Sequence, residues 1–318
     1  MGNEKREMKS GKREVGNEKW KTGGMGMNVL QNRYPRFVKN RILKKEMLEA
    51  LRDYSFAYAQ LKYQNYGQGI LYGCDVSVEE KQLVVGKGMI KCGSWIGLLT
   101  EELAVPYGPA AQMQYLKLLV SEREDSLDEI VYRIALVLDT KEVSKGKKER
   151  NLGQKEENAE KKEGDAGQEG ENTGINVGNE IEICRFYLRD GARLRGEYKD
   201  FADRMTEYDT INRIYADWGA LRGQSLDPSI TGKFAEILIK SRESQAEDFS
   251  FACLCLNQNG AVPREIIRGY LARKLGRQVA EDTGNQELFQ MMCQVVSGLD
   301  CGMEREVLRR EKRRIWVE

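Results

Sequence analysis

The stretch GILYGCDVSVEEKQLVVGKGMIKCGSWIGLL, residues 69–99, constrains the fold more than any other part of this chain, because six glycines divide it into short apolar runs. Runs this short are typical of strands joined by tight turns rather than of helices. Val76 and Val78 alternate with polar neighbours, as one face of a half-buried strand does. We therefore predict hairpins here, with the glycines supplying positive φ at the turns.

The same glycines raise the alternative of a phosphate-binding loop, and the neighbouring residues argue against it. Gly88 and Gly93 have the spacing of the GxxxxGK[ST] motif, but Ser94 and Trp95 follow instead of lysine and a hydroxyl residue. No helical pattern follows the glycines, so no helix N-terminus is predicted to face a phosphate. We expect no nucleotide cofactor and no ATP-driven motor.

Composition narrows the chemistry further, because the chain contains no histidine. This excludes Ser-His-Asp and Cys-His catalysis and every metal site that needs a histidine ligand. The seven cysteines form no CxxC motif and lie mostly in apolar contexts, which predicts buried free thiols in a reducing cytoplasm. We therefore predict no catalytic residue, no metal and no cofactor, and expect a protein that is not an enzyme.

The N-terminal part of the chain divides into a polar tail and a helix. Residues 1–28 are rich in Gly, Lys and Glu and are predicted to be a disordered tail. Residues 29–66 are predicted to contain a long amphipathic helix over 36–64, with Pro35 before it and Gly67 after it. Its apolar side either packs on a sheet or binds a partner. The residues that define this side are Val38, Ile42, Leu48, Leu51, Tyr58 and Leu61.

Residues 67–225 are predicted to form an antiparallel, β-sandwich-like domain. Strand patterns occur at 113–121, at 127–139, where a helix remains an alternative, and at 181–191, and a short strand or extended segment is expected at 211–219. Residues 141–179 interrupt the pattern with 8 Lys/Arg, 9 Asp/Glu and 7 Gly. We predict that this segment is a disordered, nearly charge-balanced insertion between strands of one domain.

The period becomes helical over residues 226–318. Asp227 and Pro228 are a cap and first residue for one helix, and later apolar patterns lie within 263–276 and 285–298. These helices are predicted to form a small bundle. No stretch approaches the ~18 consecutive apolar residues of a membrane span, so none is expected. The predicted fold class is therefore α+β: an N-terminal helix, a β domain with a long insertion, and a C-terminal helical bundle.

A basic run follows the predicted bundle, with six Lys/Arg among residues 305–314. A solvated helix face explains such a run, and so does a docking site for an acidic protein or a nucleic acid. Large apolar residues beside the charges favour docking, because such residues dominate interface energies. The predicted partner-binding residues are Arg309, Arg310, Lys312, Arg313, Arg314 and Trp316.

The order of elements and the glycine-turned strands resemble a known family. The pattern G-x-L-x-G-C-x-V-x-V…L-x-V-x-x-G is similar to the β shell domain of phage-tail and contractile-injection baseplate subunits, including the type VI secretion baseplate component TssK. The insertion at 141–179 departs from that family. The resemblance implies a structural protein that forms oligomers. The residues that carry it are Gly69, Leu71, Gly73, Cys74, Val76, Val78, Leu83, Val85 and Gly88.

Two functions therefore remain. The first is a non-enzymatic assembly subunit of a phage-tail-like, baseplate-type complex, with the β domain for oligomerisation and the helical domain for docking protein partners. The alternative is a nucleic-acid-associated protein, a helicase-type accessory without its own motor, that uses the basic C-terminus. The net charge of +1 favours neither nucleic acid nor an anionic membrane over the whole chain.

Reversing charge in the basic run tests its role. The like charges cost helix stability by roughly 0.2–0.5 kcal/mol per i,i+4 pair, so local stability does not explain them. Changing Arg309 and Arg313 to Glu should abolish binding of an acidic protein partner while the fold is retained. If the ligand is nucleic acid, the salt dependence of binding should flatten by about one unit per lost phosphate contact. If neither binding responds, the run is a solvated face.

Overall fold

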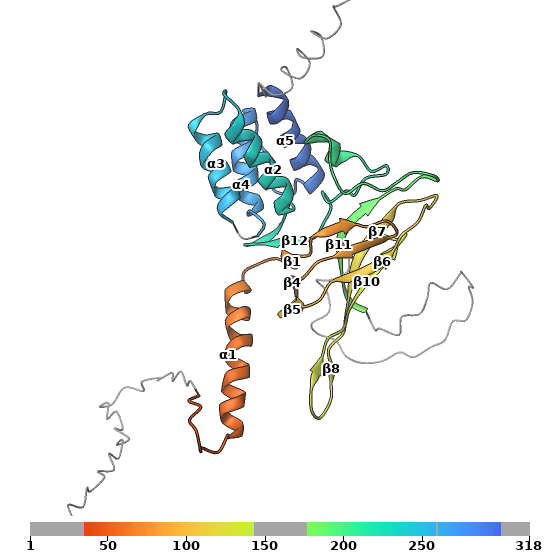
Figure 1. Cartoon of the computed structure of the whole chain (residues 1–318). Helices are drawn as coiled ribbons and strands as arrows, with labels where there is room; N and C mark the ends of the chain where they lie inside the picture. Colours follow the sequence, from red (N-terminus) through yellow and green to blue (C-terminus); the bar gives the residue numbers. More distant parts are fainter. Residues whose placement is uncertain (1–34, 143–176, 259, 300–318) are drawn as a thin grey trace, which may run out of the picture. The chain divides into compact units, whose positions relative to one another are not determined.

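The computed structural model describes residues 35–142, 177–258 and 260–299 (Figure 1). It confirms the predicted α+β class, with an N-terminal helix, several antiparallel sheets and a group of C-terminal helices. The chain divides into two units, residues 1–56 and residues 57–318. None of the helices among the described residues combines the length and apolar character needed to cross a bilayer.

The largest sheet has five strands and brings the two ends of the β-rich region together. All its pairs are antiparallel except one, in which Ile70 lies parallel to and opposite Trp218. Its strands, in spatial order, are β13 (Gly223–Ser225), β12 (Trp218–Ala220), β1 (Gly69–Gly73), β4 (Gly88–Cys92) and β5 (Trp95–Leu99).

Three smaller sheets complete the strands of the described residues. One hydrophobic core, which includes Ile70, Leu83, Ile90, Leu118 and Ile183, draws on the five-stranded sheet and both three-stranded sheets. The sheets are β10 (Ile134–Asp139), β7 (Gln114–Ser121) and β11 (Val177–Phe186); β2 (Val76–Val78), β3 (Gln82–Val85) and β6 (Leu103–Pro106); and β8 (Glu124–Asp125) with β9 (Ile130–Val131).

Only half of the six glycines of residues 69–99 have the positive φ that was predicted for them. Gly69, Gly73 and Gly93 lie in that region, with φ of 120°, 67° and 61°. Gly88 and Gly97 serve close packing instead. A Cβ at Gly88 would lie 2.4 Å from the Cys74 sulfur, and one at Gly97 would lie 2.4 Å from the Trp95 ring. The prediction of positive φ at every glycine was therefore wrong for the others.

Backbone approaches backbone closely where β1 meets β12. The Gly67 N–H donates to the Ala220 carbonyl at 2.8 Å, and the Ile70 N–H donates to the Asp217 carbonyl at 2.7 Å. A Cβ added at Gly67 would lie 2.3 Å from the Gly223 carbonyl oxygen. Side chains at this crossing would therefore force the two segments apart.

The predicted insertion is shorter at both ends than its composition indicated. Lys141 and Glu142 follow β10 directly, and Val177 and Asn179 already pair with β7 opposite Ser121 and Val120. The eight residues of β7 offer a hydrogen-bonding edge that polar residues can occupy as well as apolar ones. Residues 143–176, the rest of the predicted insertion, lie outside the described residues, as do residues 1–34 and 300–318.

Segments 127–139 and 211–219 were both predicted from strand patterns, and the structure shows which parts of them form regular strands. The first forms strands β9 and β10, which settles the strand-or-helix alternative. The second is a regular strand only from Trp218 onward, and Thr210 and Asn212 make isolated bridges to Arg195 and Arg185.

The C-terminal helices start and stop close to the predicted signals. The Asp227 side chain accepts from the Ser229 N–H at 2.7 Å, and Pro228 is the first helical residue. Gly276 ends its helix in the left-handed conformation, at φ 63°. The helices are α2 (Pro228–Lys240), α3 (Ala246–Asn257), α4 (Arg264–Leu275) and α5 (Asn285–Gly298).

These helices surround a second core, which also takes residues from the β-rich segment. Phe201 stacks on Phe289 with ring centroids 4.9 Å apart, and Ile214 is buried in the same cluster. The Arg213 guanidinium, on a side chain that is 11% exposed, pairs with the carboxylate of the capping Asp227 at 2.6 Å. The N-terminus of α2 is therefore tied to the chain that precedes β12.

Asp248 on α3 links two helices inside this second core. Its carboxylate, fully buried, accepts from the Tyr270 hydroxyl at 2.7 Å, from the Lys274 ammonium at 2.6 Å and from the Gln245 N–H at 2.8 Å. Burial raises the pKa of this carboxyl, but the Lys274, Gln245 and Tyr270 hydrogen bonds outweigh it and hold the pKa below its ordinary value. The carboxylate thus joins α3 to α4.

Replacing Asp248 with Asn should lower the free energy of unfolding by about 3 kcal/mol at pH 7, because Lys274 loses its buried counter-charge. The exposed Asp282→Asn change is the matched control and should have little effect. A lowered carboxyl pKa stabilises the fold above the unfolded pKa, and this stability is lost as the pH falls through the folded pKa. The difference between parent and variant in urea unfolding should therefore shrink below about pH 4. Equal losses in both variants would contradict this role.

Candidate interaction surface

Helix α1 (Lys45–Tyr63) is shorter than predicted, because residues 36–44 are not helical. Asn40 adopts positive φ, 65°, which breaks a right-handed helix. Basic residues are also crowded before Lys45, where the positive end of the helix dipole disfavours them. Glu46 in the first turn and Lys62 in the last turn complement the dipole of the helix that does form.

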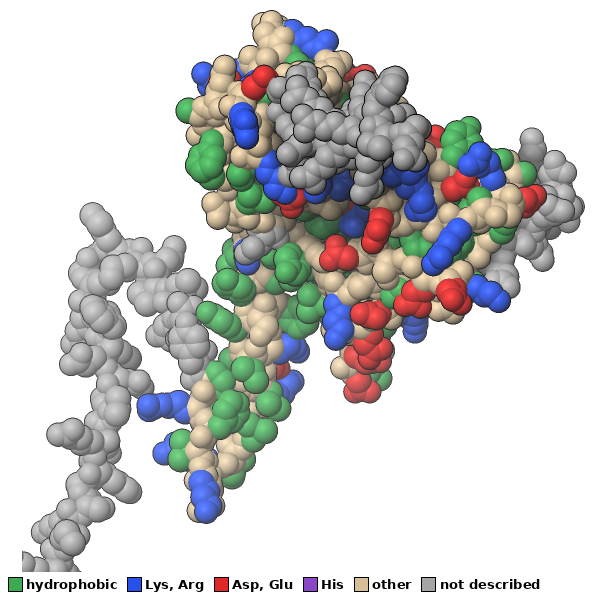
Figure 2. Space-filling view, turned by 45° about the horizontal axis from the view of Figure 1, so that its top comes forward, with side chains coloured by type: hydrophobic (Ala, Val, Ile, Leu, Met, Phe, Trp, Pro, Cys, Tyr) green, Lys and Arg blue, Asp and Glu red, His purple; other side chains and the backbone are tan. Residues whose placement is uncertain are grey.

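No residue of α1 is buried, although the helix is rich in large apolar side chains. Figure 2 shows hydrophobic side chains along its length. The rings of Tyr54, Phe56 and Tyr58 alone leave roughly 250–450 Å² of surface exposed to solvent, if each side chain has about 150–250 Å² in total. The side chains lie on more than one face of the helix, and those that share one face are Leu51, Tyr54, Tyr58 and Leu61. A contiguous exposed apolar patch of this kind is often functional. The exposed fractions are Leu48 49%, Leu51 52%, Tyr54 56%, Phe56 59%, Tyr58 59% and Leu61 67%.

Such a helix gains little from its own sequence. A helix of 19 residues is marginal in water unless an apolar face packs against something. The exposed pair Lys45 and Glu49, with nitrogen and oxygen 3.4 Å apart, adds only a few tenths of a kcal/mol. The sequence predicted that the apolar side either packs on a sheet or binds a partner; in the described residues its side chains on α1 are exposed.

A buried lysine holds the C-terminal end of α1. The Lys91 ammonium, from β4, donates to the carbonyls of Tyr63 at 2.7 Å, Gln64 at 3.0 Å and Tyr66 at 2.6 Å. The Tyr63 and Gln64 carbonyls lie at the negative end of the helix dipole, which a cation stabilises, and Tyr66 follows just beyond the helix. Burial lowers the pKa of Lys91. Lys91 therefore fixes the point where the helix joins the β-rich region.

The six predicted partner-binding residues cannot be placed by the structure. Arg309, Arg310, Lys312, Arg313, Arg314 and Trp316 all lie outside the described residues. Their role stays a prediction.

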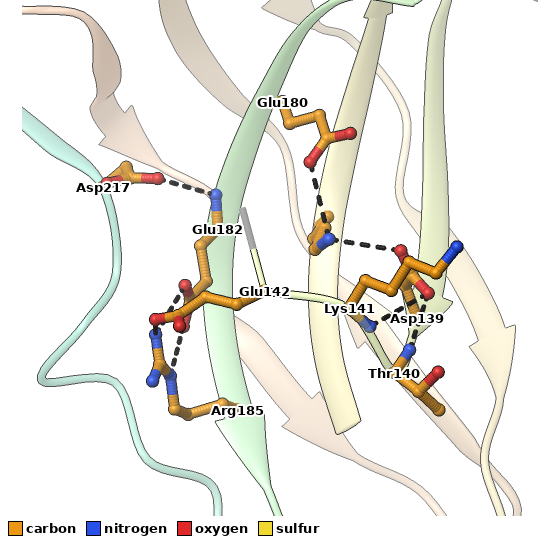
Figure 3. A network of polar contacts seen from close by, with 9 residues as sticks. Asp139, Thr140, Lys141, Glu142, Glu180, Glu182, Arg185 and Asp217 are labelled. Atoms are coloured by element: carbon orange, nitrogen blue, oxygen red, sulfur yellow. Dashed lines mark hydrogen bonds and ion pairs between the residues drawn. The ribbon is translucent and has the colours of Figure 1, made fainter. Parts of the chain in front are cut away.

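The structure also shows a charged network that the sequence analysis did not predict. It lies on the face of the sheet β10-β7-β11 opposite the face that packs in the hydrophobic core (Figure 3). Lys117 of β7, 1% exposed, lies between two carboxylates: its ammonium is 3.2 Å from Asp139 of β10 and 3.4 Å from Glu180 of β11. Burial raises the pKa of Asp139, but hydrogen bonds from Lys141 and Thr140 backbone and from Lys117 outweigh it and lower the pKa. Three strands are thus joined through one ammonium.

The network continues along β11. Arg185 donates to the buried Glu182 at 2.7 Å and to Glu142 at 2.8 Å, while the Asp217 carboxylate accepts from the Glu182 N–H at 2.9 Å. The Arg185 guanidinium also lies 3.9 Å from the centroid of the Tyr215 ring. Burial lowers the pKa of Arg185, but the bonds to Glu182 and Glu142 outweigh it and raise the pKa.

Each of the two cations, Lys117 and Arg185, pairs with two carboxylates, so the network joins the strands and fixes Glu142, the last described residue before 143–176. A sequence signal for it exists. Lys117 interrupts an apolar strand, and Glu180 and Glu182 alternate with isoleucines on another. What the sequence does not show is that β7 lies between β10 and β11, which brings the three together.

The cysteines that the structure describes fit the predicted buried thiols in part. Cys74, Cys92, Cys184 and Cys255 are buried, whereas Cys253 and Cys293 are half-buried, and none of these six described cysteines forms a disulfide. Burial raises the pKa of the Cys74, Cys184 and Cys255 thiols to about 12 and that of Cys293 to about 11. Thiols in this state are poor nucleophiles. Within the described ranges no group of acidic or sulfur side chains is arranged to hold a metal.

Comparison with known proteins gives little further guidance. No family model matches the chain, and no curated protein matches it. A solved structure described as "Crystal structure of TssK" is similar with a TM-score of 0.34 and 7% identity, over 84% of this chain and 72% of that one. Membership of a family does not follow from a likeness at that level.

Replacing Lys91 with Met should lower the free energy of unfolding by about 1.5–3 kcal/mol, because three carbonyls lose a charged donor. Amide exchange near Tyr63 should also become faster, since the end of α1 is released. The exposed Lys87→Met change, on the neighbouring turn, is the matched control. Urea unfolding and hydrogen exchange by mass spectrometry measure both effects. Unchanged exchange near Tyr63 in the Lys91 variant would show that the ammonium does not anchor the helix.

Proposed function

We propose that this chain is a non-enzymatic structural subunit that functions by binding protein surfaces within a larger assembly. The finer proposal is a phage-tail-like, baseplate-type complex, which rests on the glycine-turned strands described in the sequence analysis. In it, α1 and the β-rich region make contacts between subunits. The helical region, with the basic run that follows it, docks a second protein.

The observation that carries this proposal is the exposed apolar surface of α1. A soluble chain that leaves six large apolar side chains about half exposed on one helix has a surface suited to another protein. Lys91 supports the same reading, because a specific buried cation holds the end of this helix. A helix without a function would not need a buried cation to hold its end in place.

Size-exclusion chromatography with light scattering tests the proposal on the full chain. We expect a discrete species heavier than the 36.4 kDa monomer, at a defined multiple of that mass. A monomer at every concentration overturns assembly through self-contacts. A monomer that also binds labelled single-stranded nucleic acid, with an affinity that falls steeply with salt, supports the alternative of a nucleic-acid-associated protein.

A further inference from the structure

The apolar residues of α1 include one series with the spacing of a coiled coil. The intervals between its members are four, three, four and three residues, an average of 3.5. Residues at this spacing lie along one stripe of a helix and form the seam by which two helices supercoil. The members of this series, the α1 seam, are Met47, Leu51, Tyr54, Tyr58 and Leu61.

The residues beside the α1 seam are small, and the charges lie away from it. Ala50, Ser55 and Ala57 flank the central part of the seam, so a second helix can approach closely. The flanking positions carry only one charge, that of Lys62. Of the two other well-exposed apolar side chains of α1, Leu48 shares the heptad position of Ser55 and Lys62 and so also flanks the seam, whereas Phe56 lies on the opposite face of the helix.

The net charge of α1 indicates which kind of partner can bind the α1 seam. Within α1, three bases balance three acids, so the helix has no net charge. A membrane-surface helix or a nucleic-acid contact carries excess Lys and Arg, and a helix that binds a charged protein carries the opposite sign. A second copy of the same neutral, apolar seam meets the requirement without repulsion. The charged residues are Lys45, Arg52 and Lys62 against Glu46, Glu49 and Asp53.

The area that such a contact buries sets its expected strength. The exposed parts of Tyr54 and Tyr58 amount to roughly 170–290 Å² per copy if each ring offers about 150–250 Å². Leu51 and Leu61, also more than half exposed, add to this. The sum stays below the ~800 Å² per partner of a standard interface. The contact is therefore of the weak, concentration-dependent class unless other surfaces join it.

We propose that the α1 seam binds the α1 seam of a second copy of this chain, forming a helical coiled-coil contact between subunits. This inference rests on the proposed function and names its partner. The same five side chains would then be covered, and a helix that is marginal alone would gain the tertiary packing that it needs.

Matched single substitutions on the full chain test the seam. The seam variant carries Tyr58→Glu. The control variant carries Phe56→Glu, which replaces an aromatic residue of equal exposure, 59%, on the opposite face of the same helix. We expect light scattering to give an oligomer for the parent and the control, and 36.4 kDa for the seam variant. Urea unfolding of the seam variant serves to confirm that the rest of the chain is folded.

The outcomes separate this inference from the proposed function. A parent oligomer that survives in the seam variant overturns the inference alone, since the subunits then assemble through another surface. Equal dissociation of both variants also overturns it, because the contact would not be specific to the seam. A parent that is monomeric at every concentration overturns both this inference and assembly through self-contacts.

A cross-link gives a second readout that does not depend on loss of binding. Tyr54 is the middle residue of α1, so in a coiled coil of either direction it lies near its own counterpart. Under mild oxidation, Tyr54→Cys should form covalent dimers beyond those of the parent, and Gln60→Cys, on the outer face, should not. Equal dimer formation by the two variants would contradict a contact through the seam.

Discussion

The close crossing of backbone at β1 and β12 is the contact on which the β-rich region depends. It joins residues near position 70 to residues near position 218 by backbone hydrogen bonds, so a large part of the chain is closed into one loop. Gly67, Gly69 and Gly219 permit the approach because a Cβ on any of them would lie within 2.4 Å of a carbonyl oxygen. Loop closure over this length costs entropy that grows slowly with length, and the shared core of the sheets offsets it.

The same crossing positions the two parts of the chain that bear on function. Lys91 on β4 donates hydrogen bonds to carbonyls at the end of α1. Arg213, just before β12, forms an ion pair with Asp227, which caps α2. Asn285, the first residue of α5, also donates to the Ile214 carbonyl at 3.0 Å. Helices at both ends of the β-rich region are thus held by buried polar groups rather than by apolar contact alone. Buried polar groups demand specific partners, so they define where each helix attaches.

The two faces of the sheet β10-β7-β11 use opposite chemistry. Leu116, Leu118 and Val120 of β7 lie in the core with at most 1% exposure, whereas Lys117 faces the charged network. Burying an ammonium group costs free energy unless carboxylates pair with it, and both Asp139 and Glu180 pair with Lys117. Removing either acid leaves Lys117 less compensated, so these three strands are coupled to one another through charge as well as through their ladders.

The sequence by itself determined the elements whose signals are local. Asp227 with Pro228 at the start of α2 and Gly276 at the end of α4 are capping and helix-ending residues, which act on their nearest neighbours. Glycine-punctuated alternation likewise determined the hairpins. Only the tertiary structure decided that Lys117 lies between Asp139 and Glu180, that Lys91 receives the end of α1, and that Gly88 and Gly97 serve packing rather than turning. These facts depend on which strands become neighbours, and strand order arises from contacts between residues distant in sequence, which no local pattern encodes.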